Sequence, residues 1–313
     1  MSTAEKVTGL INAARDQWED DRADGRQVIT VCLDTSSLAA GVQSTLDALR
    51  SEIERLGHDV IIRTSGSWGF CWLEPTVAVR SAGGGLTVLY HSVTEDRVEE
   101  FVQRTIVQGE TMPELALGIV EGNATGDIGL LADHPFMQGQ IRRLMEKSGK
   151  IDPEDINHYL ALGGYEGFVK ALTQTDEQII EEMLNSGLGG RGGGGFPAGR
   201  KWDFLRTATA DPRYLVCNAD EGDPGAWVNR ILLEGDPHLI VEGMLIAALA
   251  TGSVEGYIYI RHEYPLAIQR MQTAVDQARE VGLLGPDALG DGRPFDLVVF
   301  AGAGSYVCGE ETG

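Results

Sequence analysis

Residues 214–302 alternate between short β-type runs and helical runs, and this alternation constrains the fold more than any other feature of the sequence. Strands are predicted at 214–219, 254–261 and 295–302, with helices at 237–252 and 265–282 between them. Strands joined by helices favour a largely parallel sheet, in which ligands bind at the carboxyl ends of the strands. We therefore predict a Rossmann-like α/β domain.

The N-terminal part predicts a second, smaller α/β domain. The predicted elements are a helix at 3–20, strands at 27–33 and 59–63 around a helix at 38–57, a hairpin at 76–80 and 86–90, and a closing helix at 94–106. This order is typical of a thioredoxin-like domain. Residues 107–132 carry no clear pattern and are predicted to be a linker. Short helices are predicted within 133–172, one of them capped by Asp152 before Pro153, and an amphipathic helix at 175–187.

Composition and charge narrow the class of protein. The chain has 25 Lys and Arg against 47 Asp and Glu, a net charge of −22, which argues against nucleic acid as a partner because phosphate binding needs clustered cations. The longest apolar run, 244–250, is too short to cross a bilayer, and the N-terminus does not resemble a secretory signal. We expect a cytoplasmic protein without direct membrane insertion, and attachment to the periphery of a membrane complex stays open.

A glycine-rich loop is the strongest local signal. Glycine occupies every position from 187 to 195 except Leu188 and Arg191. Glycine lets backbone amides approach a ligand closely, and successive amides can form a nest for an anion. Arg191, Arg200 and Lys201 add the positive charge that a flavin phosphate or a pyrophosphate needs. These properties predict a phosphate-binding loop.

Two other interpretations of this loop are weaker. Gly190, Gly192 and Gly195 fit the spacing G-x-G-x-x-G, but a helix rather than a strand precedes them, so an ordinary dinucleotide fingerprint is not predicted. A flexible linker would be rich in serine and would not carry Phe196 and Trp202 directly after the glycines.

Two further polar loops follow predicted strands. Residues 217–227 hold Asn218, Asp220, Glu221 and Asp223, and residues 302–313 hold Tyr306, Glu310 and Glu311. An amide can bond a flavin or ribose edge, and carboxylates can accept bonds from ribose hydroxyls. The three carboxylates of the first loop could instead bind Mg²⁺ or Ca²⁺, and their residue types taken alone favour a solvated turn.

Taken together and in this order, the three loops resemble the family of flavin-carrying, NADH-oxidising proteins found in complex I and in soluble NAD-linked hydrogenases and formate dehydrogenases. The resemblance rests on GLGGRGGGGFPAGRKW (187–202), NADEGDPGA (218–226) and GSYVCGEETG (304–313), with DHPFMQGQ (133–140) in support. It implies an FMN-dependent NADH dehydrogenase, or diaphorase, subunit that moves a hydride between NAD(H) and FMN. Electrons then pass to iron–sulfur clusters of a multi-subunit oxidoreductase.

The resemblance also implies roles for individual residues. Glu221 matches a residue near the nicotinamide and is the catalytic candidate, Phe196 and Phe204 match aromatics that pack on NAD(H), and Asp223 matches an acidic position near the ribose. The implied FMN contacts are Gly190, Arg191, Gly192, Lys201, Asn218, Asp220, Tyr306, Gly309, Glu310 and Glu311. The implied division is a thioredoxin-like domain at 1–110, a linker with short helices at 111–172, and an FMN- and NAD(H)-binding domain at 173–313 that is incomplete at its C-terminus.

Iron–sulfur clusters are where the chain departs from the family. Soluble members often bind [2Fe-2S] in the N-terminal domain through C-x4-C and C-x3-C, and the corresponding residues here are Cys32, Ser37, Ser67 and Cys71. Serine replaces a thiolate poorly at neutral pH, so a [2Fe-2S] cluster is not expected. A [4Fe-4S] cluster is expected only in a region beyond residue 313. The alternative function is a non-catalytic assembly subunit that retains the fold.

Overall fold

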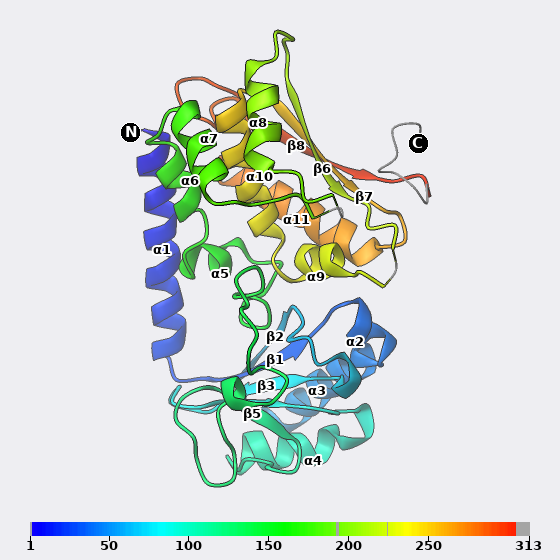
Figure 1. Ribbon diagram of the computed structural model, residues 1–313. Helices are drawn as coiled ribbons and strands as arrows, with labels where there is room; N and C mark the ends of the chain where they lie inside the picture. Colours follow the sequence, from blue (N-terminus) through cyan, green and yellow to red (C-terminus); the bar gives the residue numbers. More distant parts are fainter. Residues whose placement is uncertain (1, 192–193, 224, 305–313) are drawn as a thin grey trace. The chain divides into compact units, whose positions relative to one another are not determined.

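The computed structural model describes residues 2–191, 194–223 and 225–304 (Figure 1). The chain is of the mixed α/β class and forms two compact units, one from Asp16–Pro153 and one from Met1–Arg15 together with Glu154–Gly313. Helix α1 (Thr3–Ala23) begins in the second unit, where Val7, Ile11 and Ala14 are buried. The compact units therefore differ from the predicted divisions at residues 110 and 172.

A five-stranded sheet forms the centre of the Asp16–Pro153 unit. Its strands are β1 (Gln27–Cys32), β2 (Val60–Ser65), β3 (Val77–Arg80), β4 (Thr87–Tyr90) and β5 (Ala116–Glu121), in the order β2-β1-β3-β4-β5. β1 is parallel to β2, and the other neighbours are antiparallel. The helices are α2 (Thr35–Ala39), α3 (Val42–Leu56) and α4 (Val98–Val102), with a π-helical turn at Gln103–Val107 and 3₁₀ turns at Cys71–Leu73, Glu95–Arg97 and Leu131–Asp133.

The two faces of this sheet pack against different segments because side chains alternate along each strand. Val79 and Val88 join Leu49 of α3 and Phe101 of α4 in one buried cluster. Ala78, Leu89 and Leu117 point to the other face, where Trp68, Phe70 and Leu131 cover them. The unit is therefore a sheet with a hydrophobic core on both faces.

Strand β5 lies inside residues 107–132, so the prediction of a linker there was wrong. β5 pairs with β4, and Ile119 donates a backbone bond to Gly129 at 2.9 Å. A Cβ atom at Gly118 would lie 2.6 Å from the Cα of Leu131, so only glycine lets this segment approach the strand. The strand was missed because glycine interrupts its apolar run.

The Glu154–Gly313 part is built on a three-stranded parallel sheet, as the alternating pattern predicts. Its strands are β6 (Tyr214–Ala219), β7 (Glu255–Ile260) and β8 (Asp296–Ala301), in the order β6-β7-β8. Its helices are α5 (Ile156–Ala161), α6 (Glu166–Ala171), α7 (Asp176–Asn185), α8 (Ala198–Thr207), α9 (Val228–Gly235), α10 (Pro237–Thr251) and α11 (Pro265–Glu280). Asp155, not Asp152, caps α5, because its side chain accepts from the amide of Asn157.

Helices α10 and α11 pack on the sheet (Figure 1), while some side chains of β6 and β8 stay exposed. Val216 is 68% exposed and Phe300 is 49% exposed, although parallel sheets are usually covered on both faces. Within the described residues, no helix has the length and apolar character needed to cross a bilayer.

A buried carboxylate joins the loop before α6 to helix α10. Glu242 Oε2 accepts bonds from the Tyr159 hydroxyl at 2.5 Å and the Tyr165 amide at 2.8 Å, and its Oε1 accepts from the Phe168 amide at 3.1 Å. The Tyr165 hydroxyl lies 2.8 Å from Nδ1 of His238, and burial lowers the pKa of this histidine to about 4. The network holds the helices beneath the sheet.

Replacing Tyr159 by Phe should destabilise the protein by about 1–3 kcal/mol, because a buried carboxylate oxygen loses its hydroxyl donor. The free energy of unfolding from urea titration measures this loss. Tyr214→Phe is the matched control, since Tyr214 is 48% exposed and should change stability little. Equal stability of the two variants would contradict the proposed importance of the network.

Candidate functional site

The glycine loop is closed at its base by backbone contacts. Gly190 donates to the carbonyl of Phe196 at 2.8 Å, and Ala198 donates to the carbonyl of Leu188 at 2.8 Å. A Cβ atom at Gly189 would lie 2.9 Å from the carbonyl oxygen of Gly195. Glycine is therefore required where the two arms of the loop approach each other.

Helix α8 presents a cation and an aromatic side chain to this loop. Lys201 Nζ lies 6.0 Å from the ring centroid of Phe196, and the rings of Phe196 and Phe204 are 6.2 Å apart. A Cβ atom at Gly190 would lie 3.7 Å from Lys201 Nζ. Gly190, Phe196, Lys201 and Phe204 thus lie together, although α8 was not among the predicted helices. Arg191 is exposed.

The acidic loop begins at the carboxyl end of β6, as the sequence predicts. Asn218 Oδ1 accepts the amide of Asp220 at 3.1 Å, which turns the chain as the strand ends. Asp220 is 5% exposed, and Asn218 is exposed. Burial raises the pKa of the half-buried Cys217 thiol, near the end of β6, to about 11, so it stays protonated and unreactive at neutral pH.

Glu221 occupies a strained and only partly satisfied position. Its φ is +49°, in the left-handed region, and its Oε2 accepts the backbone amides of Asn229 and, at 3.1 Å, Arg230 at the start of α9. Its Oε1 is buried and has no hydrogen-bond partner among the described residues. Burial raises the pKa of this carboxyl, against the lowering effect of the two amides and of Arg230 and Arg261. Such a combination is typical of functional carboxylates.

Three residues beside Glu221 were missed by the sequence analysis. Arg261, directly after β7, donates to the carbonyl of Glu221 at 2.8 Å, and its guanidinium lies 5.1 Å from the ring centroid of Tyr264. Arg230 lies 5.7 Å from the same ring. The signal for Arg261 was its place at the carboxyl end of a parallel strand, next to that of β6.

The metal alternative for the acidic loop gains no support from this geometry. Asp223 is exposed and its Oδ1 accepts the amide of Gly225 at 2.9 Å, while Glu221 binds the start of α9. Within the described residues, the donor atoms close enough to share a cation belong instead to Cys32, Asp34 and Glu74. Gly192, Tyr306, Gly309, Glu310 and Glu311 lie outside the described residues, so their predicted roles stay predictions.

The four positions of the N-terminal cluster motif do not provide a suitable ligand set for [2Fe-2S]. The Ser37 hydroxyl is part of a capping box with Asp34, and the amide of Gly69 donates to Ser67 Oγ at 3.0 Å. Burial, and then Asp34 and Glu74, raise the pKa of the Cys32 thiol well above its usual range. Two hydroxyls engaged in local structure leave two thiols, fewer than such a cluster needs.

Comparison with known proteins identifies relatives of the site-bearing segment. Residues 183–313 match the family of the Nuo51 FMN-binding domain. The NADP-reducing hydrogenase subunit HndC of Solidesulfovibrio fructosivorans is 52% identical over 173 residues, which cover 55% of this chain and 35% of that protein. An NADH-quinone oxidoreductase subunit of Aquifex aeolicus is 43% identical over 177 residues, 56% of this chain and 41% of that protein.

A solved structure of NAD⁺-reducing [NiFe]-hydrogenase in the air-oxidized state is also similar. It is 22% identical, with a TM-score of 0.42, and the match covers 92% of this chain and 45% of that chain. The chain spans less than half the length of the two curated relatives.

Replacing Glu221 by Gln should change how stability depends on pH. A raised pKa means that the folded protein holds this proton more tightly, so the stabilisation is present below the ordinary value of 4.5 and is lost as pH rises through the folded pKa. The variant lacks this loss, so its stability relative to the parent should rise between about pH 4 and pH 7. Urea titrations across this range measure the difference.

Glu263→Gln is the matched control. Its hydrogen bond with Arg261 lowers the pKa of Glu263 to about 2, so its stabilisation is present above the ordinary pKa and is lost as pH falls. The relative stability of this variant should fall as pH rises from about 2 to about 5, so its urea titrations extend to this lower range. If the relative stabilities of both variants changed with pH in the same direction, the opposite pKa shifts assigned to Glu221 and Glu263 would be contradicted.

Proposed function

We propose that the chain holds FMN, binds NAD(H) and acts as the NADH dehydrogenase part of a larger redox enzyme, because residues 183–313 match the family of the Nuo51 FMN-binding domain. The family match confirms the resemblance carried by the three sequence motifs. The observation that carries the proposal is the grouping of Lys201 and two aromatic rings at the closed glycine loop.

The residues present fit an FMN phosphate. Gly190 leaves open the space beside Lys201 Nζ that a side chain would fill, and a lysine cation at a glycine-lined backbone is suited to phosphate. In this proposal Gly190, Arg191 and Lys201 bind the phosphate, while Asn218 and Asp220 contact the rest of the flavin. FMN held by these residues would supply the chemistry of accepting a hydride from NADH and releasing electrons singly.

In this proposal, two aromatic side chains and two carboxylates of the chain bind and orient NAD(H). Phe196 and Phe204, exposed by 41% and 62%, offer flat apolar surfaces for NAD(H). The Oε1 of Glu221, which has no partner in the described part of the chain, can accept a bond from an amide donor. Asp223, exposed in the same loop, is suited to a ribose hydroxyl. Arg261 is a positioning residue, because it fixes the backbone of Glu221.

Electron transfer onward requires partner subunits. The relatives are named as subunits of a hydrogenase and of a quinone oxidoreductase, which supports a multi-subunit complex whose iron–sulfur clusters receive the electrons. A thioredoxin-like fold of residues 27–107 is supported by the parallel β1–β2 pair beside the antiparallel β3–β4 pair. In this proposal that unit carries no [2Fe-2S] cluster and serves assembly.

Lys201→Gln should weaken FMN binding at least about tenfold, because a charge-assisted bond to phosphate contributes roughly 1.5–3 kcal/mol. Titration of the flavin-free protein with FMN, followed by flavin fluorescence, measures the dissociation constant. Arg206→Gln is the matched control on the same helix, since Arg206 pairs with Asp203 and Glu177 and should leave FMN affinity unchanged. Equal affinities of both variants, or no FMN binding by the parent, would favour the assembly role instead.

Iron and sulfide analysis tests whether the chain itself binds a [2Fe-2S] cluster that could carry the electrons onward. The chain, purified anaerobically without partners, should contain far less than the roughly two irons and two sulfides of a [2Fe-2S] cluster. Stoichiometric iron with an EPR signal after reduction would show that the serines at positions 37 and 67 do not prevent cluster binding.

A further inference from the structure

A small cavity in the Asp16–Pro153 unit gathers cations in a strongly acidic chain. Arg22, Arg63, Arg80 and Lys150 line it, and it has a volume of about 40 Å³. Glu121 is the single carboxylate among its lining residues, all of which belong to the described part of the chain. In a protein with a net charge of −22, this concentration of positive charge needs a physical reason.

Contacts with neighbouring residues hold the guanidinium groups of Arg63 and Arg80 in place, and one buried donor of Arg80 has no partner in the described part of the chain. Arg80 is 6% exposed, its terminal nitrogen donates to the carbonyl of Asp21 at 3.2 Å, and its buried Nε has no partner among the described residues. Arg63 donates to the Thr30 hydroxyl at 3.2 Å and stacks over Trp18 at 5.4 Å. These contacts fix the two arginines but do not neutralise their charges.

The one carboxylate at the cavity is already engaged. Arg22 binds both oxygens of Glu121, at 3.2 and 3.0 Å. Burial, and then the neighbouring Arg22, lower the pKa of Arg80; burial and then Arg80 lower the pKa of Arg63, which Asp152 and Glu121 partly oppose. Like charges thus repel around the cavity, and a bound anion would relieve that repulsion.

We propose that this cavity binds an oxyanion of the phosphate class. A single water needs roughly 10–15 Å³ of such volume, so 40 Å³ holds a compact tetrahedral ion. Arginine forks bind such oxygens in pairs, and the Thr30 hydroxyl, which accepts from Arg63, keeps its own hydrogen as a further donor at the cavity wall. This site is separate from the proposed FMN site, because its residues lie in the other compact unit.

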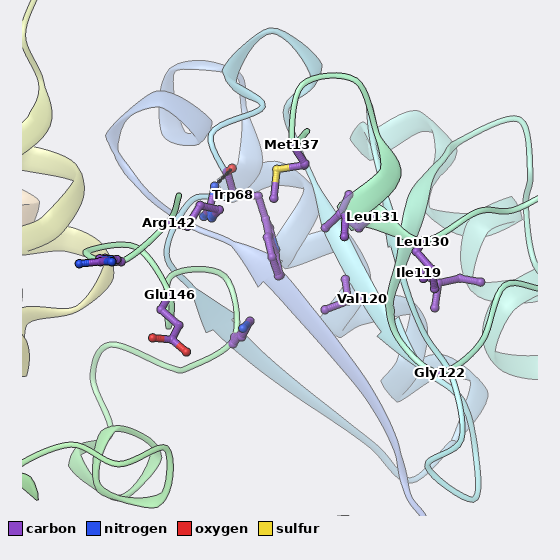
Figure 2. A pocket seen from close by; sticks show the side chains of 12 residues that line it. Trp68, Ile119, Val120, Gly122, Leu130, Leu131, Met137, Arg142 and Glu146 are labelled. Atoms are coloured by element: carbon purple, nitrogen blue, oxygen red, sulfur yellow. Dashed lines mark hydrogen bonds between the residues drawn. The ribbon is translucent and has the colours of Figure 1, made fainter. Parts of the chain in front are cut away.

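A larger pocket next to the cavity indicates what kind of chemical group a bound anion could carry. It has a volume of about 550 Å³ and shares Trp68, Val120 and Lys150 with the cavity. In the view of Figure 2, Trp68 stands between Leu131 and Met137 on one side and Arg142 and Glu146 on the other. The apolar side chains of Trp68, Leu131 and Met137 are suited to the apolar body of a phosphate ester. Free phosphate and an ester would present the same anion to the cavity.

The wall around Trp68 is rigidly built. Arg142 donates to the carbonyl of Trp68 at 3.0 Å, and Ser148 Oγ donates to the carbonyl of Ser67 at 2.7 Å. A Cβ atom at Gly149 would lie 2.3 Å from the indole, so only glycine permits this packing. The pocket is therefore formed before a ligand binds, which limits the ordering that binding requires.

Isothermal titration of the full chain with inorganic phosphate, at constant ionic strength set with chloride, tests the proposal. Phosphate should bind to the parent, and Arg63→Gln should weaken that binding at least about tenfold. Glu121→Gln should strengthen it several-fold, because it removes the competing carboxylate. Arg55→Gln is the matched control, since Arg55 pairs with Glu52 on the exposed surface of α3.

Unfolding would weaken phosphate binding in either variant. Weaker binding in Arg63→Gln together with stronger binding in Glu121→Gln therefore cannot arise from unfolding. Lys201→Gln should bind phosphate as the parent does, which separates this site from the proposed FMN site. Tighter binding of phenyl phosphate than of phosphate would support an ester as ligand, and equal binding would support the free anion. The proposal would be overturned if phosphate gave the parent no more heat of binding than chloride does. It would also be overturned if Lys201→Gln lost phosphate binding, or if Arg55→Gln lost as much binding as Arg63→Gln.

Discussion

The contact between the Glu221 side chain and the start of α9 is the constraint on which the candidate site depends. Glu221 Oε2 binds the amides of Asn229 and Arg230, and this contact holds its backbone at a φ of +49°. The chain can then leave β6 and turn sharply into the helix. Arg261, at the end of β7, closes the same loop from the neighbouring strand.

In each compact unit, a few cations lie together where an anionic ligand is proposed to bind. The net charge of −22 means that an anionic ligand is repelled unless lysine and arginine are concentrated locally. Lys201 provides this at the glycine loop, and Arg63 and Arg80 do so at the cavity beside β1 and β3. Most other arginines pair with nearby carboxylates, as Arg206 does with Asp203 and Glu177.

The N-terminal unit illustrates how a sequence motif and its structural setting can differ. The spacing of Cys32, Ser37, Ser67 and Cys71 follows a cluster motif, yet the Ser37 hydroxyl accepts the amide of Asp34 in a capping box and Cys32 is buried beside two carboxylates. A capping box of this kind stabilises the local backbone without a metal.

The sequence by itself determined the parallel strands β6, β7 and β8, the helices α10 and α11 between them, and the polar residues at the strand ends, because hydrophobic periodicity and strand–helix alternation are local signals. The order of the motifs also pointed to the family whose domain matches residues 183–313. Only the tertiary structure decided that β5 joins the first sheet, that Arg261 supports Glu221, and that Arg22, Arg63 and Arg80 surround one cavity. Strand pairing and charge clustering unite residues far apart in the chain, which no local pattern records.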